Sequence, residues 1–148
     1  MITNTPQEQL SALYDAQKAY FRTGETLSLE FRKQQLRTFR DQLRKHEKAL
    51  IDALWLDLHK SYEEAYLTEL GLVYGEINMA LKNLGKWSRD ECVRSTMSIL
   101  PSRSKVIKEP LGTALIIAPW NYPVQLLLNP LVGAIAAGCT AVLKPSPY

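Results

Sequence analysis

The chain has 148 residues, of which 46% are hydrophobic and 22% are charged, and its formal net charge is +3. This length is sufficient for one domain with a hydrophobic core, and the composition is typical of soluble globular proteins. The small net charge does not by itself indicate a nucleic-acid partner. The two cysteines, Cys92 and Cys139, form no CxxC pair, so we expect neither a disulfide framework nor a zinc site. The first residues lack a signal-peptide pattern, which favours a cytoplasmic protein.

Apolar residues recur at helical spacing through most of the first 92 residues. A first helix is predicted from about Pro6 to Arg22, with one face formed by Leu10, Leu13, Gln17 and Tyr20. A long second helix is predicted to begin after a cap at Thr26 or Ser28. Its apolar stripe comprises Leu29, Leu36, Phe39, Leu43, Leu50, Leu54 and Leu58.

A third helix is predicted from about Tyr62 to Arg89. Its apolar stripe comprises Leu70, Val73, Ile77, Leu81, Leu84 and Trp87. Glu63, Glu64 and Glu69 make its first turns acidic, which suits the positive end of the dipole of this helix. We therefore expect these glutamates to stabilise the helix on which they lie.

The polar face of the second predicted helix is rich in lysine and arginine. Glu30, Asp41 and Glu47 are mixed among the basic residues, and no aromatic residues are interleaved for base stacking. A solvated helix face is therefore favoured over a nucleic-acid site. His46 and His59 lack a nearby cysteine or histidine at ligand spacing, and we expect both to be surface or boundary residues.

Shorter elements are predicted after Cys92. Residues 94–110 alternate in character and indicate extended segments in a hairpin. Residues 113–118 and 140–143 are short apolar runs, predicted to be strands buried on both faces. Between them, residues 124–138 predict an apolar helix ended by Gly138. A strand, a turn, a helix and a second strand form a βαβ unit, so the fold class is α/β with a parallel sheet.

An uncharged run from Leu111 to Leu143 is long enough to raise the alternative of a membrane span. Pro119, Pro123 and Pro130 interrupt this run. Proline removes a backbone donor and disfavours helix at the residue before it. A buried strand–turn–helix–strand unit with no membrane contact is therefore the favoured interpretation.

Two polar side chains follow the predicted strands, Asn121 after the first and Lys144 after the second. Ligands of parallel sheets bind beyond the carboxyl ends of the strands, so both residues are candidates for a site. From spacing alone, Asn121 could equally cap the following helix, and Lys144 could be a solvated strand end. Gly133 and Gly138 are not followed by the lysine and hydroxyl of a phosphate-binding loop, and no GxGxxG motif is present. Cys139 lies in an apolar setting and is interpreted as structural.

The segment from Glu109 to Ser146 contains the motifs IIAPWNYP, QLLLNPLVGAIAAGC and VLKPS. These motifs closely resemble aldehyde dehydrogenases, and most of all the class 3 and fatty-aldehyde branch. The resemblance covers about 38 residues. It implies that the helices lead into the first βαβ unit of a Rossmann-like cofactor domain, of which only part is present in this chain.

The resemblance also implies roles for individual residues. Asn121 would donate its side-chain N–H to the oxyanion that forms when a catalytic thiolate attacks the aldehyde. Such a fixed dipole in a dry site lowers the barrier by roughly 3–4 kcal/mol. Lys144 would contact the adenosine ribose of NAD or NADP. The rest of the cofactor cleft would be lined by Ile117, Ala118, Pro119 and Trp120.

The implied activity is the NAD(P)-dependent oxidation of a small-molecule aldehyde to a carboxylic acid, through thiolate addition, hydride transfer and thioester hydrolysis. In the family, the nucleophilic cysteine, the general base and the pyrophosphate turn follow the KPS motif beyond Tyr148, so we expect this chain alone to be inactive. The family usually has glutamate where this chain has Pro147. The implied organisation is a helical part of the cofactor domain (1–92), a bridging segment that builds a homodimer (93–110) and the βαβ unit (111–148). A non-catalytic helical interaction or dimerisation module is the alternative.

Overall fold

The computed structural model describes residues 4–147, and its first helices follow the predicted pattern. Helix α1 spans Gln7–Arg22, and the long helix α2 spans Leu29–Leu58. A 3-10 turn, η1 (Glu25–Leu27), joins them. The Ser28 hydroxyl accepts a hydrogen bond of 3.4 Å from a backbone N–H in the first turn of α2. Of the two predicted caps, Ser28 is therefore the one observed.

The predicted third helix is confirmed, but it contains a π-helical turn. It begins as α3 (Tyr62–Ala65), widens into the π turn η2 (Tyr66–Leu70) and continues as α4 (Gly71–Trp87). A π turn closes i→i+5 hydrogen bonds, so it changes which side chains face the neighbouring helices. Such turns occur frequently at functional sites.

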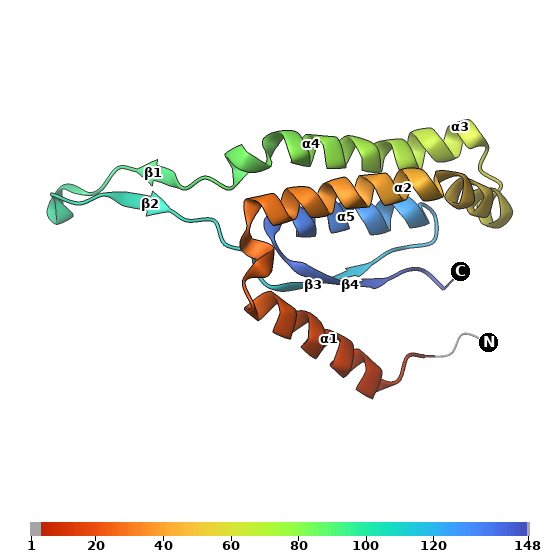
Figure 1. The fold of residues 1–148 in the computed structure, drawn as a ribbon, viewed down its shortest axis with the longest axis horizontal. Helices are drawn as coiled ribbons and strands as arrows, with labels where there is room; N and C mark the ends of the chain where they lie inside the picture. The colour runs from red at the N-terminus through yellow and green to blue at the C-terminus, as the bar shows by residue number, and fades with distance from the viewer. Residues whose placement is uncertain (1–3, 148) are drawn as a thin grey trace.

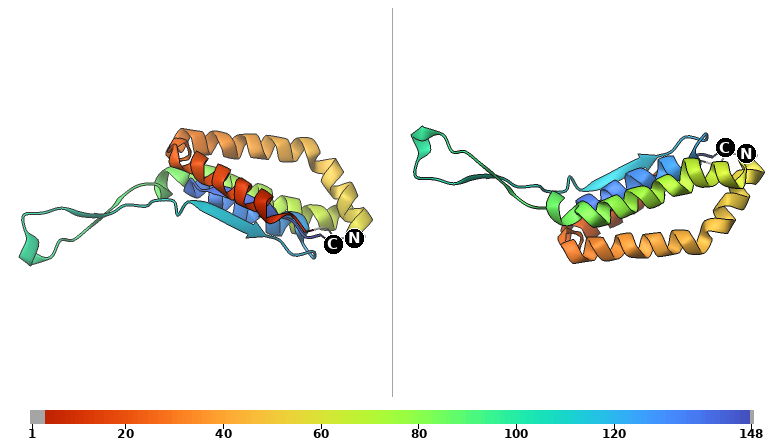
Figure 2. Two further views of the ribbon diagram at one scale, coloured as in Figure 1. Left: turned by 90° about the horizontal axis from the view of Figure 1, so that it is seen from below. Right: turned by 90° about the horizontal axis from the view of Figure 1, so that it is seen from above.

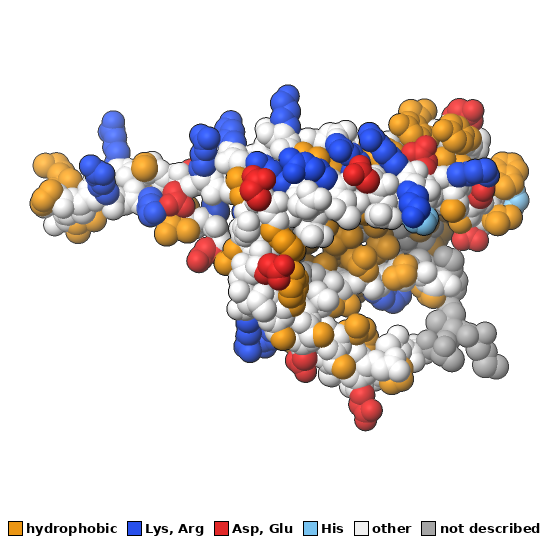
Figure 3. Space-filling model, in the orientation of Figure 1, with side chains coloured by type: hydrophobic (Ala, Val, Ile, Leu, Met, Phe, Trp, Pro, Cys, Tyr) orange, Lys and Arg blue, Asp and Glu red, His pale blue; other side chains and the backbone are white. Residues whose placement is uncertain are grey.

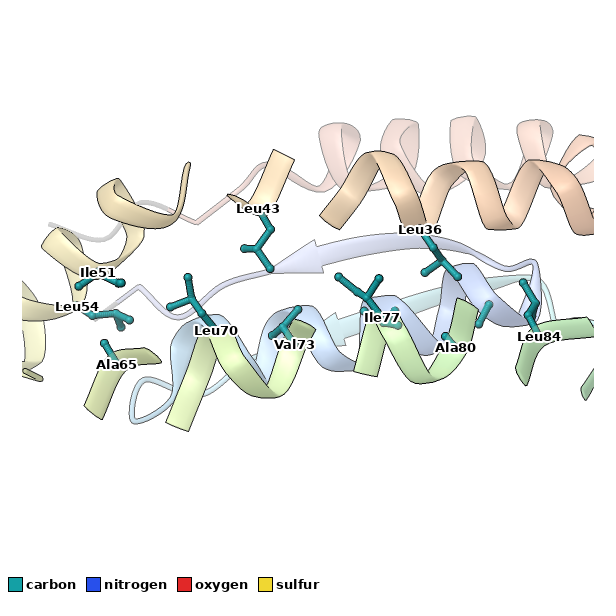
Figure 4. Packing of buried hydrophobic residues seen from close by; sticks show 12 residues of the cluster. Leu36, Leu43, Ile51, Leu54, Ala65, Leu70, Val73, Ile77, Ala80 and Leu84 are labelled. Carbon is teal, nitrogen blue, oxygen red and sulfur yellow. The ribbon is translucent and has the colours of Figure 1, made fainter. Parts of the chain in front are cut away.

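The core lies where α2 packs on α4 and on α5 (Pro123–Ala137). Figure 4 shows Leu36 and Leu43 of α2 pointing toward α4. Full burial of a leucine or isoleucine side chain contributes about 1.5–3 kcal/mol, so this cluster provides the main driving force for packing the helices. Its buried members are Leu36, Leu43, Ile51, Leu54, Ala65, Leu70, Val73, Ile77, Ala80, Leu84, Val132 and Ala136.

Helix α1 is confirmed at nearly its predicted bounds, but it takes little part in this core, and none of its residues is buried. Leu10 and Leu13 are 44% and 50% exposed. The helix meets the sheet through a hydrogen bond of 3.2 Å that the Thr140 hydroxyl donates to the carbonyl oxygen of Gln17. Its outer turns extend beyond that contact, where no described element covers the leucines.

The predicted βαβ unit is confirmed. Strands β3 (Thr113–Ile117) and β4 (Thr140–Lys144) pair in parallel, and α5 connects them. Gly138 ends α5 with a left-handed φ of 88°, a conformation that favours glycine. The two strands lie between α5 on one side and α1 on the other (Figure 1). This order delivers the carboxyl ends of both strands to one edge of the molecule.

Strand β3 is predicted to be buried on both faces, but one of its faces is largely exposed. Ile116 is buried, whereas Leu115 and Ile117 are 64% and 63% exposed. Alternate residues of a strand point to opposite faces, so Leu115 and Ile117 share the face opposite Ile116. Helix α1 covers the amino end of that face only, and nothing else within residues 4–147 covers the rest.

The predicted hairpin is observed as an arm that projects from the helical body (Figures 1 and 2), but its first strand lies before the predicted range of 94–110. Strands β1 (Glu91–Val93) and β2 (Ser104–Val106) pair antiparallel, and a 3-10 turn, η3 (Met97–Ile99), lies near the tip. Lys108 and Glu91 form an ion pair of 2.6 Å at its base, and the hydrogen bond lowers the pKa of Glu91. The paired part of the arm therefore begins at Glu91.

Lysine and arginine side chains are spread over the surface of α2, with acidic residues among them (Figure 3). Lys48 and Asp52, for example, form an exposed ion pair of 2.6 Å. Both His46 and His59 are exposed, as predicted. No helix within residues 4–147 has the length and apolarity that crossing a bilayer requires.

Candidate active site at the carboxyl edge of the parallel strands

The register of the two parallel strands brings both predicted polar groups to one edge. Ile117, the last residue of β3, pairs with Lys144, the last residue of β4. The N–H of Ala118 donates a hydrogen bond of 3.1 Å to the carbonyl oxygen of Lys144, which extends the ladder by one step. The turn that carries Asn121 begins directly after Ala118, so Asn121 and Lys144 leave the sheet at the same edge.

The residues predicted to line a cofactor cleft differ in exposure. Ile117 and Trp120 are 63% and 59% exposed, and Pro119 is also exposed. Ala118 is buried, so it contributes little more than backbone. Lys144 is exposed and is the last residue of β4. An accessible apolar and aromatic surface beside a cation fits a nucleotide, which carries both a base and phosphates.

The side chain of Asn121 is exposed and makes no hydrogen bond with another residue in the described part of the chain. The N-cap of α5 is Tyr122, and no side chain of the turn itself caps the helix. The alternative that Asn121 is merely a helix cap is therefore wrong. Its amide N–H groups are left available to a molecule bound at this edge.

The N-terminus of α5 is instead capped by Glu69 from the π turn. Its Oε2 accepts hydrogen bonds of 2.8 Å and 3.2 Å from the N–H groups of Val124 and Gln125. Glu69 is fully buried. A carboxylate at the positive end of a helix dipole is favourable, and here it belongs to a different helix. Glu63 and Glu64 lie in the first turn of α3, as predicted, whereas the carboxylate of Glu69 accepts its backbone hydrogen bonds from α5 and not from its own helix.

Lys60 completes this buried arrangement. Its Nζ donates to Glu69 Oε1 at 2.6 Å and to the carbonyl oxygen of Asn121 at 2.9 Å. The same ammonium lies 3.9 Å from the centre of the Tyr122 ring, within reach of a cation–π interaction. A buried ion pair is tolerated when further hydrogen bonds satisfy both partners, as they do here. Lys60 and Glu69 thus hold the turn from two sides.

The π turn determines where Glu69 lies. Gly71 follows the turn, and its N–H donates to the carbonyl oxygen of Tyr66. A Cβ atom at Gly71 would lie 2.8 Å from that oxygen, closer than real Cβ atoms approach. Glycine at this position therefore permits the widened turn that directs Glu69 toward α5.

The other end of α5 is held by Arg32 of α2. Its guanidinium donates to the carbonyl oxygens of Ala136 at 2.8 Å and Leu27 at 3.1 Å. A cation at the negative end of a helix dipole is favourable. Partial burial lowers the pKa of Arg32, although arginine remains charged at any physiological pH. The carboxylate of Glu69 at the N-terminus of α5 and the guanidinium of Arg32 at its C-terminus therefore hold the helix at both ends.

Neither cysteine lies at this edge. Cys139 precedes β4, so it lies at the amino end of the strand, opposite to Asn121. Cys92 is exposed on the projecting arm. Within residues 4–147, no His, Cys, Asp and Glu side chains cluster in a group that could hold a metal ion.

Sequence reasoning missed Lys60, Glu69 and Tyr122 as parts of the site. A signal existed for Glu69, which is spaced four residues from both Ala65 and Val73. Both of those neighbours are buried, so a charged residue on this helix face needs a buried partner. Lys60 carries no such signal, because a lysine between two helices is usually solvated.

Comparison with known proteins is consistent with this geometry. The model of the aldehyde dehydrogenase family matches residues 1–148. The chain is 45% identical over 133 residues to the 4,4'-diaponeurosporen-aldehyde dehydrogenase of Staphylococcus aureus, which covers 90% of this chain and 29% of that protein. It is 42% identical over 138 residues to a dimeric, NADP-preferring aldehyde dehydrogenase of Canis lupus familiaris, covering 93% of this chain and 30% of the relative.

Among solved structures, the substrate-bound state of Staphylococcus aureus AldH superimposes with a TM-score of 0.91 at 41% identity. The match covers 97% of this chain and 31% of that structure. The chain therefore spans less than a third of the length of these relatives. The family model, the sequence identity and the shared fold together show that the chain belongs to the aldehyde dehydrogenase family.

Proposed function

We propose that this chain supplies the N-terminal part of an NAD(P)-dependent, class 3-like aldehyde dehydrogenase that oxidises an aldehyde to a carboxylic acid. The observation that carries the proposal is Asn121, whose side-chain amide is exposed at the carboxyl edge while its backbone is held by Lys60. Two relatives named as aldehyde dehydrogenases match nearly all of this chain but less than a third of their own length. The complete enzyme is accordingly proposed to be longer than these 148 residues.

The proposed role of Asn121 is to stabilise negative charge on the aldehyde oxygen. When a thiolate adds to the carbonyl carbon, the oxygen becomes an oxyanion, and an amide N–H already directed at it needs no reorganisation. The benefit depends on a donor that is fixed before the reaction begins. A backbone held between Lys60 and the cap of α5 serves this requirement by fixing the point from which the side chain of Asn121 leaves the chain.

The proposed cofactor site comprises Ile117, Ala118, Pro119, Trp120 and Lys144. The nicotinamide cofactor, when bound, supplies the hydride acceptor. Trp120 and Ile117 offer an exposed apolar surface, and Lys144 offers a cation for the ribose or its phosphate. One relative is named as NADP-preferring, which supports NADP as well as NAD.

The nucleophile is proposed to come from outside residues 1–148, because neither Cys92 nor Cys139 lies near Asn121. The bridging segment of residues 93–110, which makes up most of the projecting arm, is proposed to contact a second copy of the chain in a homodimer. It projects from the body and exposes Met97, Ile99 and Leu100. The canine relative is named as dimeric, which supports this assignment.

Replacing Asn121 with alanine in the complete enzyme tests the proposal. We expect kcat to fall by about 10²–10³-fold, since one oxyanion donor is lost, with the KM for the cofactor changing by less than about twofold. Asn78→Ala is the control, because Asn78 is an exposed asparagine in the middle of α4, where its Oδ1 accepts a hydrogen bond of 3.4 Å from Arg40. A kcat within a few-fold of wild type, with only the melting temperature lowered, would refute the catalytic role.

A further inference from the structure

The side chain of Asn121 makes no hydrogen bond that orients its amide, so some other group must fix the direction in which it leaves the backbone. Its carbonyl oxygen is the acceptor for Lys60 Nζ, and the first two N–H groups of α5, those of Val124 and Gln125, donate to Glu69. Between these groups, Pro123 has no N–H to donate. One buried ion pair thus engages the backbone on both sides of the junction between the turn and α5.

We propose that Lys60 and Glu69 are positioning residues for the oxyanion donor, acting on the chemistry only through Asn121. This inference depends on the proposed role of Asn121. Lys60 fixes the peptide that follows Asn121, and Glu69 fixes the first turn of α5, and together these contacts restrict the directions open to the Cα–Cβ bond of Asn121. Both side chains are nearly or fully buried, at 8% and 0% exposure.

The direct contact between Lys60 and Glu69 links the two parts of the backbone that they hold. Lys60 Nζ and Glu69 Oε1 are 2.6 Å apart, and the other carboxylate oxygen accepts hydrogen bonds from the N–H groups of Val124 and Gln125 in α5. Glu69 in turn lies on the π turn, which the N–H of Gly71 closes by donating to the carbonyl oxygen of Tyr66. A shift of the ammonium would therefore move the Asn121 carbonyl and, with it, the side-chain amide. Displacements of about 1 Å in a reacting geometry can cost about 10²-fold in rate.

The test is a double-mutant cycle in the complete enzyme. The variant Lys60→Met with Glu69→Gln removes both charges together, so no unpaired charge stays buried, and the amide oxygen of the introduced glutamine can still accept from α5. We expect kcat to fall at least about tenfold while the KM for the cofactor changes by less than about twofold. In an Asn121→Ala background the same double change should lower kcat by less than about twofold, because its target is already absent.

The control is Lys48→Met with Asp52→Asn, which removes an ion pair of the same 2.6 Å length from the exposed surface of α2. It should leave kcat unchanged in both backgrounds. Should the buried double variant fail to fold, Lys60→Arg takes its place, since it retains the charge but changes the donor geometry. For that variant we expect at least a threefold loss of kcat that disappears when Asn121 is replaced by alanine.

The outcomes separate the two proposals. If Asn121→Ala lowers kcat strongly but the folded Lys60 variants stay within twofold of wild type, the positioning role is overturned and the role of Asn121 stands. The positioning role is also overturned if the fold-loss of kcat from the Lys60 and Glu69 change is the same with and without Asn121→Ala. In that case the pair acts independently of Asn121. If Asn121→Ala leaves kcat unchanged, the proposed function itself fails, and the positioning inference fails with it.

Discussion

The N–H of Ala118 donates a hydrogen bond of 3.1 Å to the carbonyl oxygen of Lys144, one step beyond the last residue pair of the parallel strands. The backbone of Lys144 is therefore part of the ladder, while its side chain is exposed and forms no hydrogen bond or ion pair with another described residue. A lysine whose backbone is held in the sheet and whose ammonium has no partner among the described residues is well placed to bind a ligand. It adds little to the stability of the fold.

Lys144→Met should therefore weaken cofactor binding without unfolding the protein. Loss of one charge-assisted hydrogen bond of about 1.5–3 kcal/mol corresponds to a rise of about 10–100-fold in the KM for NAD(P). We expect kcat and the melting temperature to stay close to wild type, as measured by steady-state kinetics and thermal unfolding of the complete enzyme. Lys48→Met provides an exposed-lysine control. An unchanged KM for both cofactors would show that Lys144 is only a solvated strand end.

Gly138 and Gly133 provide a test of how α5 is terminated. Gly138 has a φ of 88°, and a Cβ atom there would lie 2.9 Å from the carbonyl oxygen of Thr26. Gly133 is inside the helix, with nothing within 4 Å of an added Cβ. Gly138→Ala should destabilise the protein by about 1–3 kcal/mol. Gly133→Ala should be neutral or stabilise it by about 0.5–1 kcal/mol.

Urea or thermal unfolding of the two glycine variants measures the difference. Both remove a glycine from the same helix region, so effects on the unfolded chain cancel in the comparison. Equal stability of the two variants would mean that the left-handed cap at Gly138 is not required.

Cys139 should be dispensable for catalysis. It lies at the amino end of β4, and at a strand rise of about 3.3 Å per residue it is about 16 Å from the carboxyl edge. Cys139→Ala in the complete enzyme should retain kcat within about twofold, and the 148-residue chain by itself should show no aldehyde oxidation. A loss of more than about 100-fold in kcat at an unchanged melting temperature would instead identify Cys139 as the nucleophile.

Much of the fold could be predicted from local patterns, because those patterns report local structure. The helical spacing of leucines predicts α2 and α4, and Gly138 between two apolar runs predicts the βαβ unit. The exposure of Leu115 and Ile117 could not be predicted in this way. An apolar strand residue is buried only where another element covers it, and the sequence of the strand does not contain that information.

The same distinction applies to the candidate site. The placement of Asn121 and Lys144 at one edge follows from strand order, which a βαβ pattern predicts. The contacts of Lys60 and Glu69 with the turn join residues 61 and 55 positions apart, which helical spacing does not reveal. The π turn that makes the second contact possible also has no pattern of its own in the sequence.

Pro147 leads to a prediction about cofactor preference. It is exposed just beyond β4, at a position where the family usually has glutamate. A carboxylate there can accept hydrogen bonds from both ribose hydroxyls, and it repels a 2′-phosphate. Proline offers neither an acceptor nor a negative charge. Lys144, three residues earlier, is a compact cation suited to a phosphate.

Position 147 therefore carries no repulsive element that would enforce NAD over NADP, and discrimination between similar ligands usually needs such an element. We expect the complete enzyme to use NADP with a kcat/KM within about tenfold of that for NAD, since tenfold is only about 1.4 kcal/mol. Pro147→Glu should shift the preference toward NAD, and Pro147→Gln, which lacks the charge, should shift it less. Steady-state kinetics with both cofactors on all three proteins decide the matter. Strict use of NAD by the wild type, unchanged by either substitution, would mean that Pro147 only turns the chain and that another residue meets the ribose.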